Sequence, residues 1–142
     1  MDIAALILST ITAGLSALAA IMTYFNNKKT SYGNLELQIR TMISDAKYRQ
    51  LEWQAKLISD PTNEVLQSQY DVLTEEVLNA YDEACAKYND GKVDKARFKK
   101  MYFHEIRQLV EDDNFKDKYS GIQSRYNATK KVYDEWNNLE NH

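Results

Sequence analysis

A chain of 142 residues with one proline, four glycines and 27% charged residues has the composition of a small helical protein. Its 18 Lys and Arg are balanced by 21 Asp and Glu, and the net charge of -3 excludes the broad positive surface that binding to nucleic acid requires. We therefore expect no nucleic-acid partner. The single cysteine, Cys85, excludes an internal disulfide framework and agrees with a reducing compartment.

Residues Ile3 to Phe25 form a stretch of 23 residues without a charge, a proline or an amide side chain. At about 1.5 Å of rise per residue, such a helix reaches roughly 34 Å, enough to cross a hydrocarbon core of about 30 Å. The stretch predicts a transmembrane anchor over residues 1–27, with Tyr24 at the headgroups. A cleaved signal peptide ending near Ala17-Leu18-Ala19 is one alternative, but the basic start is missing and the apolar run is too long. A buried helix of a soluble domain is the other alternative, but the stretch has no polar face.

Charges on the two sides of this stretch differ. Asp2 precedes it, whereas Lys28 and Lys29 follow it directly. Positive residues stay on the cytoplasmic side of a membrane. The predicted protein therefore crosses an inner or plasma membrane once, with its N-terminus outside and its C-terminal domain in the cytoplasm.

Small side chains recur at every fourth position of the predicted span. They are Ala5, Ser9, Ala13 and Ala17. Such a face lets helices approach closely in lipid, so it predicts self-association in the membrane. A second face with Thr12, Ser16, Ala20 and Thr23 has the same character. Because Ala, Ser and Thr are common in any spanning helix, a simple tether remains the alternative.

A juxtamembrane linker or a frayed helix end is expected over residues 28–33, and the C-terminal domain over residues 34–142. Asn34 resembles a helix N-cap, and the first helix of the domain would end at Ser59, before Asp60-Pro61. Asp60 would then cap the next helix, with Pro61 at its first position. The predicted apolar face of the first helix consists of Leu35, Ile39, Met42, Ala46, Gln50, Trp53 and Leu57.

The second helix of the domain has the most regular spacing in the chain. Its stripe steps by three and four residues through Leu66, Tyr70, Leu73, Val77, Ala80, Ala84 and Tyr88. This spacing is close to a heptad, so an intermolecular coiled coil is one interpretation. We prefer packing within a small bundle because the stripe includes two tyrosines and two alanines. Asn89-Asp90-Gly91 is expected to end the helix.

Two further helices complete the domain. Asp94 would cap the third helix, with Val93 packing on Phe98 as a hydrophobic staple. A stripe from Phe115 to Trp136 predicts the fourth, which Ser120-Gly121 would split or kink. The expected fold is all-α, with one transmembrane helix followed by a bundle of about four helices.

Catalytic and metal-binding patterns fail at their key positions. His104-Glu105 begins a zinc-protease pattern, but Gln108 stands where the second histidine ligand belongs. A calcium loop aligned on Gly91 retains Asp90 almost alone as an oxygen ligand. We therefore expect no metal, no cofactor and no enzymatic activity.

One local cluster of basic residues follows the second helix. It comprises Lys92, Lys95, Arg97, Lys99 and Lys100. Such a cluster would suit anionic headgroups or an acidic partner. A solvated helix face is the simpler interpretation because Asp94 interrupts the run. Basic residues in a first turn oppose the helix dipole, which favours the functional interpretation slightly.

Two segments, Leu78–Asp112 and Tyr126–Trp136, carry a resemblance to known proteins. The pattern is an aromatic helix, a turn with Gly91-Lys92-Val93-Asp94, and then Phe and Tyr on the next helix. In this respect the chain resembles small bacterial and prophage single-pass membrane proteins with an uncharacterised helical domain. The resemblance implies a bacterial or phage inner-membrane setting and no specific functional residue.

The leading functional hypothesis is a membrane-anchored interaction protein. Its helical domain would bind another protein at the cytoplasmic face, for example in phage exclusion or defence. The alternative is a membrane-active effector whose span oligomerises into a pore or lesion. The span has Ser and Thr but no charged residue to line a pore.

Overall fold

The computed structural model of the chain describes residues 3–120 and 124–138, and for residues 4–10 the backbone only. All of its regular elements are α-helices, which confirms the expected all-α class. The chain divides into two compact units, residues 1–34 and residues 35–142. We describe each unit by itself.

The first helix, α1, spans Ile3–Ser59 and therefore runs through the region predicted to be a linker. Residues 28–33 are thus helical and do not form a break in the helix, and the expected N-cap at Asn34 is wrong. The region has no proline, and its single glycine, Gly33, costs a helix only about 1 kcal/mol. In addition, the Lys28 ammonium lies 5.6 Å from the centre of the Tyr32 ring, four residues along the same helix.

The side chains of residues 11–31 are exposed. Within the side chains that the structure describes, no helix contains a stretch both long and apolar enough to cross a membrane. That finding does not extend to the side chains of residues 4–10.

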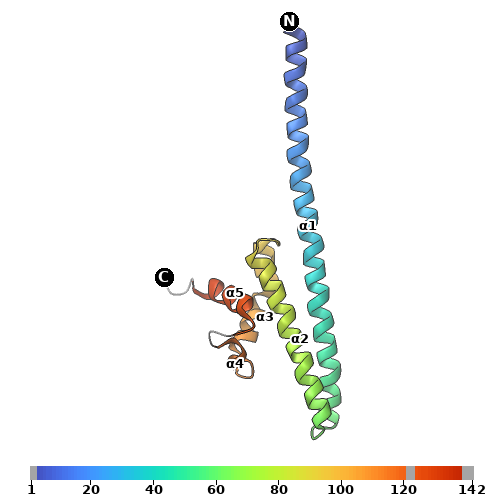
Figure 1. Cartoon of the computed structure of the whole chain (residues 1–142), viewed down its shortest axis with the longest axis vertical. Helices are drawn as coiled ribbons and strands as arrows, with labels where there is room; N and C mark the ends of the chain where they lie inside the picture. Colours follow the sequence, from blue (N-terminus) through green and yellow to red (C-terminus); the bar gives the residue numbers. More distant parts are fainter. Residues whose placement is uncertain (1–2, 121–123, 139–142) are drawn as a thin grey trace. The chain divides into compact units, whose positions relative to one another are not determined.

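In the second unit, α1 ends at Ser59, as predicted, and α2 spans Glu64–Asn89. The expected cap at Asp60 is wrong, because Asn63 occupies the N-cap position. The Asn63 side-chain oxygen accepts from the backbone N–H of Val65 at 3.1 Å and of Leu66 at 3.2 Å. The Asp60 carboxylate instead accepts from Asn63 Nδ2 at 3.1 Å, so it orders the turn. From this turn, α2 returns beside the C-terminal part of α1 (Figure 1).

The end of α2 and the start of α3, which spans Lys95–Glu111, follow the prediction. Gly91 has a φ of +66°, a conformation that glycine adopts without the strain of a side chain. Asp94 Oδ1 accepts from the backbone N–H of Arg97 at 3.0 Å and so caps α3. Val93 and Phe98 are both buried in the main core.

The expected fourth helix is split into α4, Lys116–Tyr119, and α5, Asn127–Asn137. Ser120 ends α4, in agreement with the weak point predicted there. The following residues 121–123, including Ile122 of the predicted stripe, lie outside the described residues.

The predicted stripes of α1 and α2 do face the core. Ile39 and Ala46 of α1 are buried, and the remaining members of its stripe are partly buried. In α2 the stripe is buried from Leu73 to Tyr88, so the preference for packing within the domain over an intermolecular coiled coil is confirmed.

A second face of α2, not predicted, is also buried. It consists of Thr74, Leu78, Tyr81 and Cys85. The reason is that α2 has neighbours on more than one side: α1 contacts it through Gln50, and α5 contacts it through Thr129 (Figure 1). Aromatic rings from α2, α3 and α5 meet in this core. The ring centres of Tyr88 and Trp136 are 5.4 Å apart, and those of Phe98 and Tyr102 are 4.7 Å apart.

Candidate functional site

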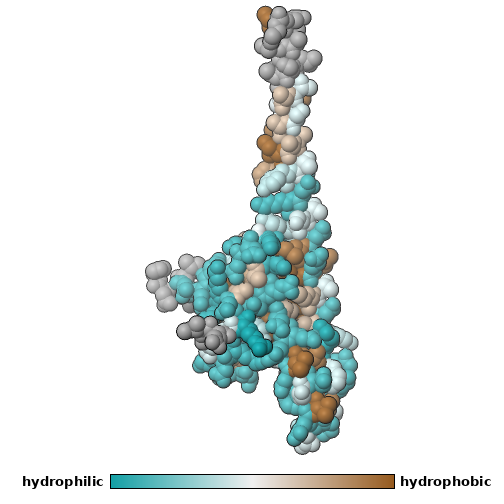
Figure 2. Space-filling model, viewed as in Figure 1, coloured by the Kyte–Doolittle hydropathy of each residue, from teal (hydrophilic) through white to brown (hydrophobic). Residues whose placement is uncertain are grey.

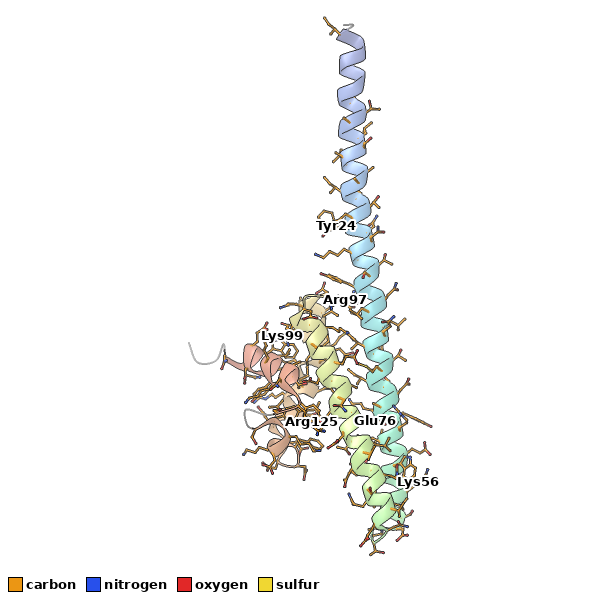
Figure 3. The ribbon with its side chains drawn as sticks, viewed as in Figure 1. Tyr24, Lys56, Glu76, Arg97, Lys99 and Arg125 are labelled. Carbon is orange, nitrogen blue, oxygen red and sulfur yellow. The ribbon has the colours of Figure 1, made fainter. Side chains whose placement is uncertain are left out.

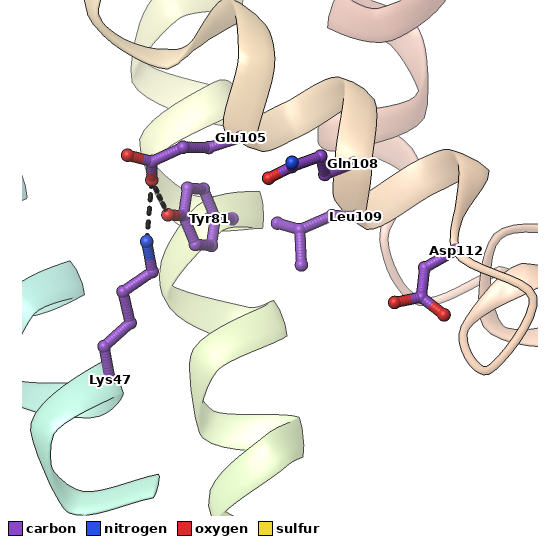
Figure 4. Close-up of a pocket in the computed structure, with 6 residues that line it drawn as sticks. All are labelled: Lys47, Tyr81, Glu105, Gln108, Leu109 and Asp112. Atoms are coloured by element: carbon purple, nitrogen blue, oxygen red, sulfur yellow. Dashed lines mark hydrogen bonds and ion pairs between the residues drawn. The ribbon is translucent and has the colours of Figure 1, made fainter. Parts of the chain in front are cut away.

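Three helices of the second unit bring Lys47, Tyr81 and Glu105 together (Figure 4). Lys47 comes from α1, Tyr81 from α2 and Glu105 from α3. The Lys47 ammonium donates to Glu105 Oε2 at 2.8 Å, and the Tyr81 hydroxyl donates to the same oxygen. The ammonium also lies 5.3 Å from the centre of the Tyr81 ring. One carboxylate oxygen therefore connects all three helices.

The surroundings settle the protonation of two of these groups. Burial of Tyr81, and then its hydrogen bond to the Glu105 carboxylate, raise the pKa of the phenol far above its usual range. Burial opposes ionisation of Glu105, but hydrogen bonds from Lys47 and Tyr81 outweigh it and lower the pKa of the carboxyl. At neutral pH the tyrosine is therefore a hydrogen-bond donor and the carboxylate a charged acceptor.

Hollows lie on both sides of this three-residue contact. The first has a volume of about 210 Å³ and continues over Gln108, Leu109 and Asp112. The second has a volume of about 300 Å³ and is lined by Arg40, Ser44, Met101 and Tyr102 in addition to Lys47 and Glu105. Both are open to the surface, and Lys47 and Glu105, the charged groups that line both of them, are already bonded to each other.

A third hollow of about 660 Å³ lies between α2 and the segment from α3 to α4. Its central contact is the ion pair between Lys118 Nζ and Glu75 Oε1, at 2.8 Å. The hydrogen bond and the charge of Lys118 lower the pKa of the Glu75 carboxyl. As in the first two hollows, the two charged groups at the centre are bonded to each other.

A carboxylate from α2 organises the start of α5. Asp82 Oδ1 accepts from the backbone N–H of Thr129 at 2.8 Å and from its hydroxyl at 3.0 Å. Tyr126 occupies the N-cap position without a side-chain capping bond, so Asp82 caps α5 from another helix. Beside it, burial raises the pKa of the Cys85 thiol to about 12. A buried thiol that stays protonated is a packing group and a poor nucleophile.

The predicted basic cluster, of which Figure 3 labels Arg97 and Lys99, is divided among several internal contacts. Arg97 forms an ion pair with Glu36 of α1 at 2.9 Å, and Lys92 pairs with Asp90 at 3.1 Å. Lys95 lies 4.7 Å from the centre of the Tyr88 ring, and Lys99 lies 5.8 Å from that of Trp136. Lys100 is exposed. These contacts explain why basic residues occupy a first helical turn, and contact with headgroups stays a prediction.

The small face predicted for membrane self-association lies in the first unit. Ala13 and Ala17 are exposed on α1, whereas the side chains of Ala5 and Ser9 lie outside the described residues. Association through this face stays a prediction. His104 is exposed, and within the described residues no three His, Cys, Asp or Glu side chains are grouped to hold a metal ion.

Sequence reasoning did not identify Lys47, Tyr81 and Glu105 as neighbours. Spacing offered one usable signal, since Tyr81 stands four residues after Val77 and thus beside the predicted α2 stripe. The partners on α1 and α3 carried no signal because they are distant in sequence. Comparisons with known proteins add no guide, since no family model, curated protein or solved structure matches this chain.

Proposed function

We propose that this protein is a membrane-anchored helical interaction protein that acts at the cytoplasmic face of an inner or plasma membrane. The observation that carries the proposal is the exposure of apolar side chains along the first unit. Between Ile11 and Phe25, seven large hydrophobic residues are between 52% and 67% exposed. Apolar surface costs about 25 cal/mol per Å² in water. Lipid would cover every side of such a helix at once.

The residues on either side of this stretch support the proposal. Before it, residues 3–10 add six Ile, Leu or Ala residues to the uncharged run, and after it Lys28 and Lys29 mark the cytoplasmic end. Tyr24 and Phe25 stand next to these lysines, at the depth where aromatic rings prefer a membrane interface. An anchor of this kind would hold residues 35–142 in the cytoplasm.

Recognition suits the second unit better than catalysis. The Tyr81 phenol stays protonated and the Glu105 carboxylate is bonded to both Lys47 and Tyr81, so neither is prepared to take up a proton from a substrate. The Cys85 thiol is buried and protonated. A partner protein is therefore the ligand class that we propose. A role in phage exclusion or defence stays a prediction that the sequence resemblance alone supports.

The anchor can be tested with a charge in the middle of the stretch. Gly14→Arg places a charge where insertion is most costly, and nothing within 4 Å of Gly14 obstructs a side chain. At a cost of about 3 kcal/mol, membrane insertion should fall roughly a hundredfold. Thr30→Arg, beyond the stretch, is the matched control and should remain in the alkali-washed membrane pellet with the wild type. A wild-type chain that stays in the supernatant would overturn the proposal.

Orientation has its own measurement. A reporter that is active only in the cytoplasm should be active when it is fused after His142. Protease added to the outer side of the membrane should leave this reporter intact. Cleavage from outside would contradict the predicted topology. Ion leakage on expression, abolished by changes in residues 3–25 and unaffected by changes in residues 35–142, would favour a membrane-active effector instead.

A further inference from the structure

The part of α1 in the second unit has two apolar faces, and only one of them is used within the chain. The inner face contributes Ile39, Ile43 and Ala46 to the core. The opposite face, the outer stripe, consists of Leu37, Thr41, Ser44, Tyr48, Leu51, Ala55 and Ile58. All seven residues are exposed, and the four large ones are between 60% and 74% exposed. Surface hydrophobics aligned in this way mark an interaction site.

The spacing of the outer stripe is that of a coiled coil. Its members follow one another at alternating intervals of four and three residues over three heptads, a length of about 32 Å along the helix. Leu37, Ser44, Leu51 and Ile58 then occupy d positions. Leucine at d, as at Leu37 and Leu51, is typical of two-stranded pairs. Thr41, Ser44 and Ala55 are small or polar, so the pairing would be weak and would depend on concentration.

We propose that residues 37–58 of α1 pair with the same residues of a second copy of this chain in a parallel two-stranded coiled coil. This names one partner for the proposed interaction protein. It rests on that proposed function in one respect only, since a membrane anchor would present two copies in the same direction. The outer stripe and its flanking charges are properties of the second unit alone.

Charges beside the outer stripe determine both the partner and the direction. One flank carries Asp45 and Glu52, and the other carries Arg40 and Lys47. In a parallel pair in register, each residue of the basic flank lies opposite the residue of the other helix whose number is five higher. Arg40 then faces Asp45 of the second copy, and Lys47 faces Glu52. An antiparallel pair would place like charges opposite each other.

These charged groups are within reach of a second helix. Arg40 and Asp45 are exposed and form no ion pair with another side chain that the structure describes. Lys47 pairs with Glu105, and Glu52 pairs with Lys56, but the Lys47 and Glu52 side chains are 42% and 52% exposed. A helix that lay on a membrane surface would carry basic residues on both flanks. The acidic flank at Asp45 and Glu52 therefore favours a second copy over lipid.

Disulfide crosslinking of the full-length chain in membranes provides the test. Ser44→Cys introduces a thiol at a d position, where two parallel helices in register bring the same residue together. Ser68→Cys, at a serine of α2 that is also exposed, is the matched control. The native Cys85 is buried and should not react. Mild oxidation should link most of the Ser44→Cys chain into dimers and leave Ser68→Cys monomeric.

Charge exchange tests the register in the Ser44→Cys background. Arg40→Asp replaces two symmetric attractions by repulsions, so the dissociation constant should rise about fivefold and the crosslinked fraction should fall. Adding Asp45→Arg should restore the crosslink, because the two charges are then exchanged and not lost. Tryptophan fluorescence, to which the buried Trp136 contributes, would verify that each variant is folded.

The other outcomes of this test overturn either the pairing or the membrane anchor, and they can be told apart. Equal crosslinking of Ser44→Cys and Ser68→Cys would show random collision, and a crosslink of different mass would show that another protein covers the outer stripe. No rescue by Asp45→Arg would exclude the parallel register. Chain that sediments with membranes yet does not crosslink would refute the coiled coil and leave the anchor standing. Crosslinked dimer found outside the membrane pellet would instead refute the anchor.

Discussion

The C-terminal part of α1 and the whole of α2 are both long helices with apolar residues at heptad-like spacing, yet they use that spacing differently. Both apolar faces of α2 are buried inside the domain, one with Val77 and Ala84 and the other with Leu78 and Cys85. In α1, Ile39 and Ala46 are buried on one side while Leu37 and Leu51 are exposed on the other.

This difference teaches that spacing alone does not separate internal packing from pairing between chains. A helix with neighbours on two sides buries two stripes, as α2 does. A helix at the margin of a domain buries one stripe and leaves the other for a partner. The hydrophilic surface in Figure 2 is interrupted by hydrophobic side chains in a few places, as expected for a domain with such a margin.

The largest expected effect is a difference in stability between two matched substitutions, one in α2 and one in α1. Leu78→Ala, at a fully buried position of α2, should lower the free energy of unfolding by about 2–5 kcal/mol through lost burial and a cavity. Leu51→Ala, on the exposed side of α1, should change it by about 0.5 kcal/mol or less in detergent at a dilution chosen to keep the chain monomeric. Urea unfolding followed by tryptophan fluorescence measures both. Similar losses would contradict the contrast between the helices.

A smaller effect tests whether α2 also organises its neighbours through a polar contact. Asp82→Ala removes the cap that α2 supplies to α5, and the free energy of unfolding should fall by about 1–2 kcal/mol. Asp82→Asn retains an acceptor oxygen, so it should lose less than half as much. The helical signal in circular dichroism would follow the same order. Identical losses in the two variants would assign the effect to something other than the cap.

The smallest effect concerns the contact that joins α1 to α2 and α3. The pKa of Glu105 is lowered in the folded state, so its carboxylate adds stability above about pH 5, and this contribution is lost as the pH falls through the folded pKa. Because the Lys47 and Glu105 side chains are both about 40% exposed, we expect their ion pair to add less than about 1 kcal/mol to the free energy of unfolding. The stability difference between the wild type and Glu105→Gln should be greatest near neutral pH and diminish below about pH 4.5. A difference that is independent of pH would contradict this interpretation.

Local signals predicted much of the fold. Asp60-Pro61, Asn89-Asp90-Gly91 and Asp94 mark ends of helices correctly because turns and caps depend on a few adjacent residues. The expected cap at Asn34 failed because a single glycine and a polar run do not stop a helix without a proline. Asn63, and not Asp60, caps α2 because the turn takes up residues 60–62.

By itself, the sequence determined the helical class, the core-facing stripes of α1 and α2, and the uncharged run of residues 3–25. Each of these is a property of neighbouring residues, through spacing, capping and hydropathy. Only the tertiary structure decided that α2 buries a second face, that Asp82 caps α5, that Lys47 and Tyr81 meet at Glu105, and that the outer stripe of α1 remains exposed. These features join residues far apart in the chain, and whether a face is covered depends on where the other helices pack, which no single helix encodes.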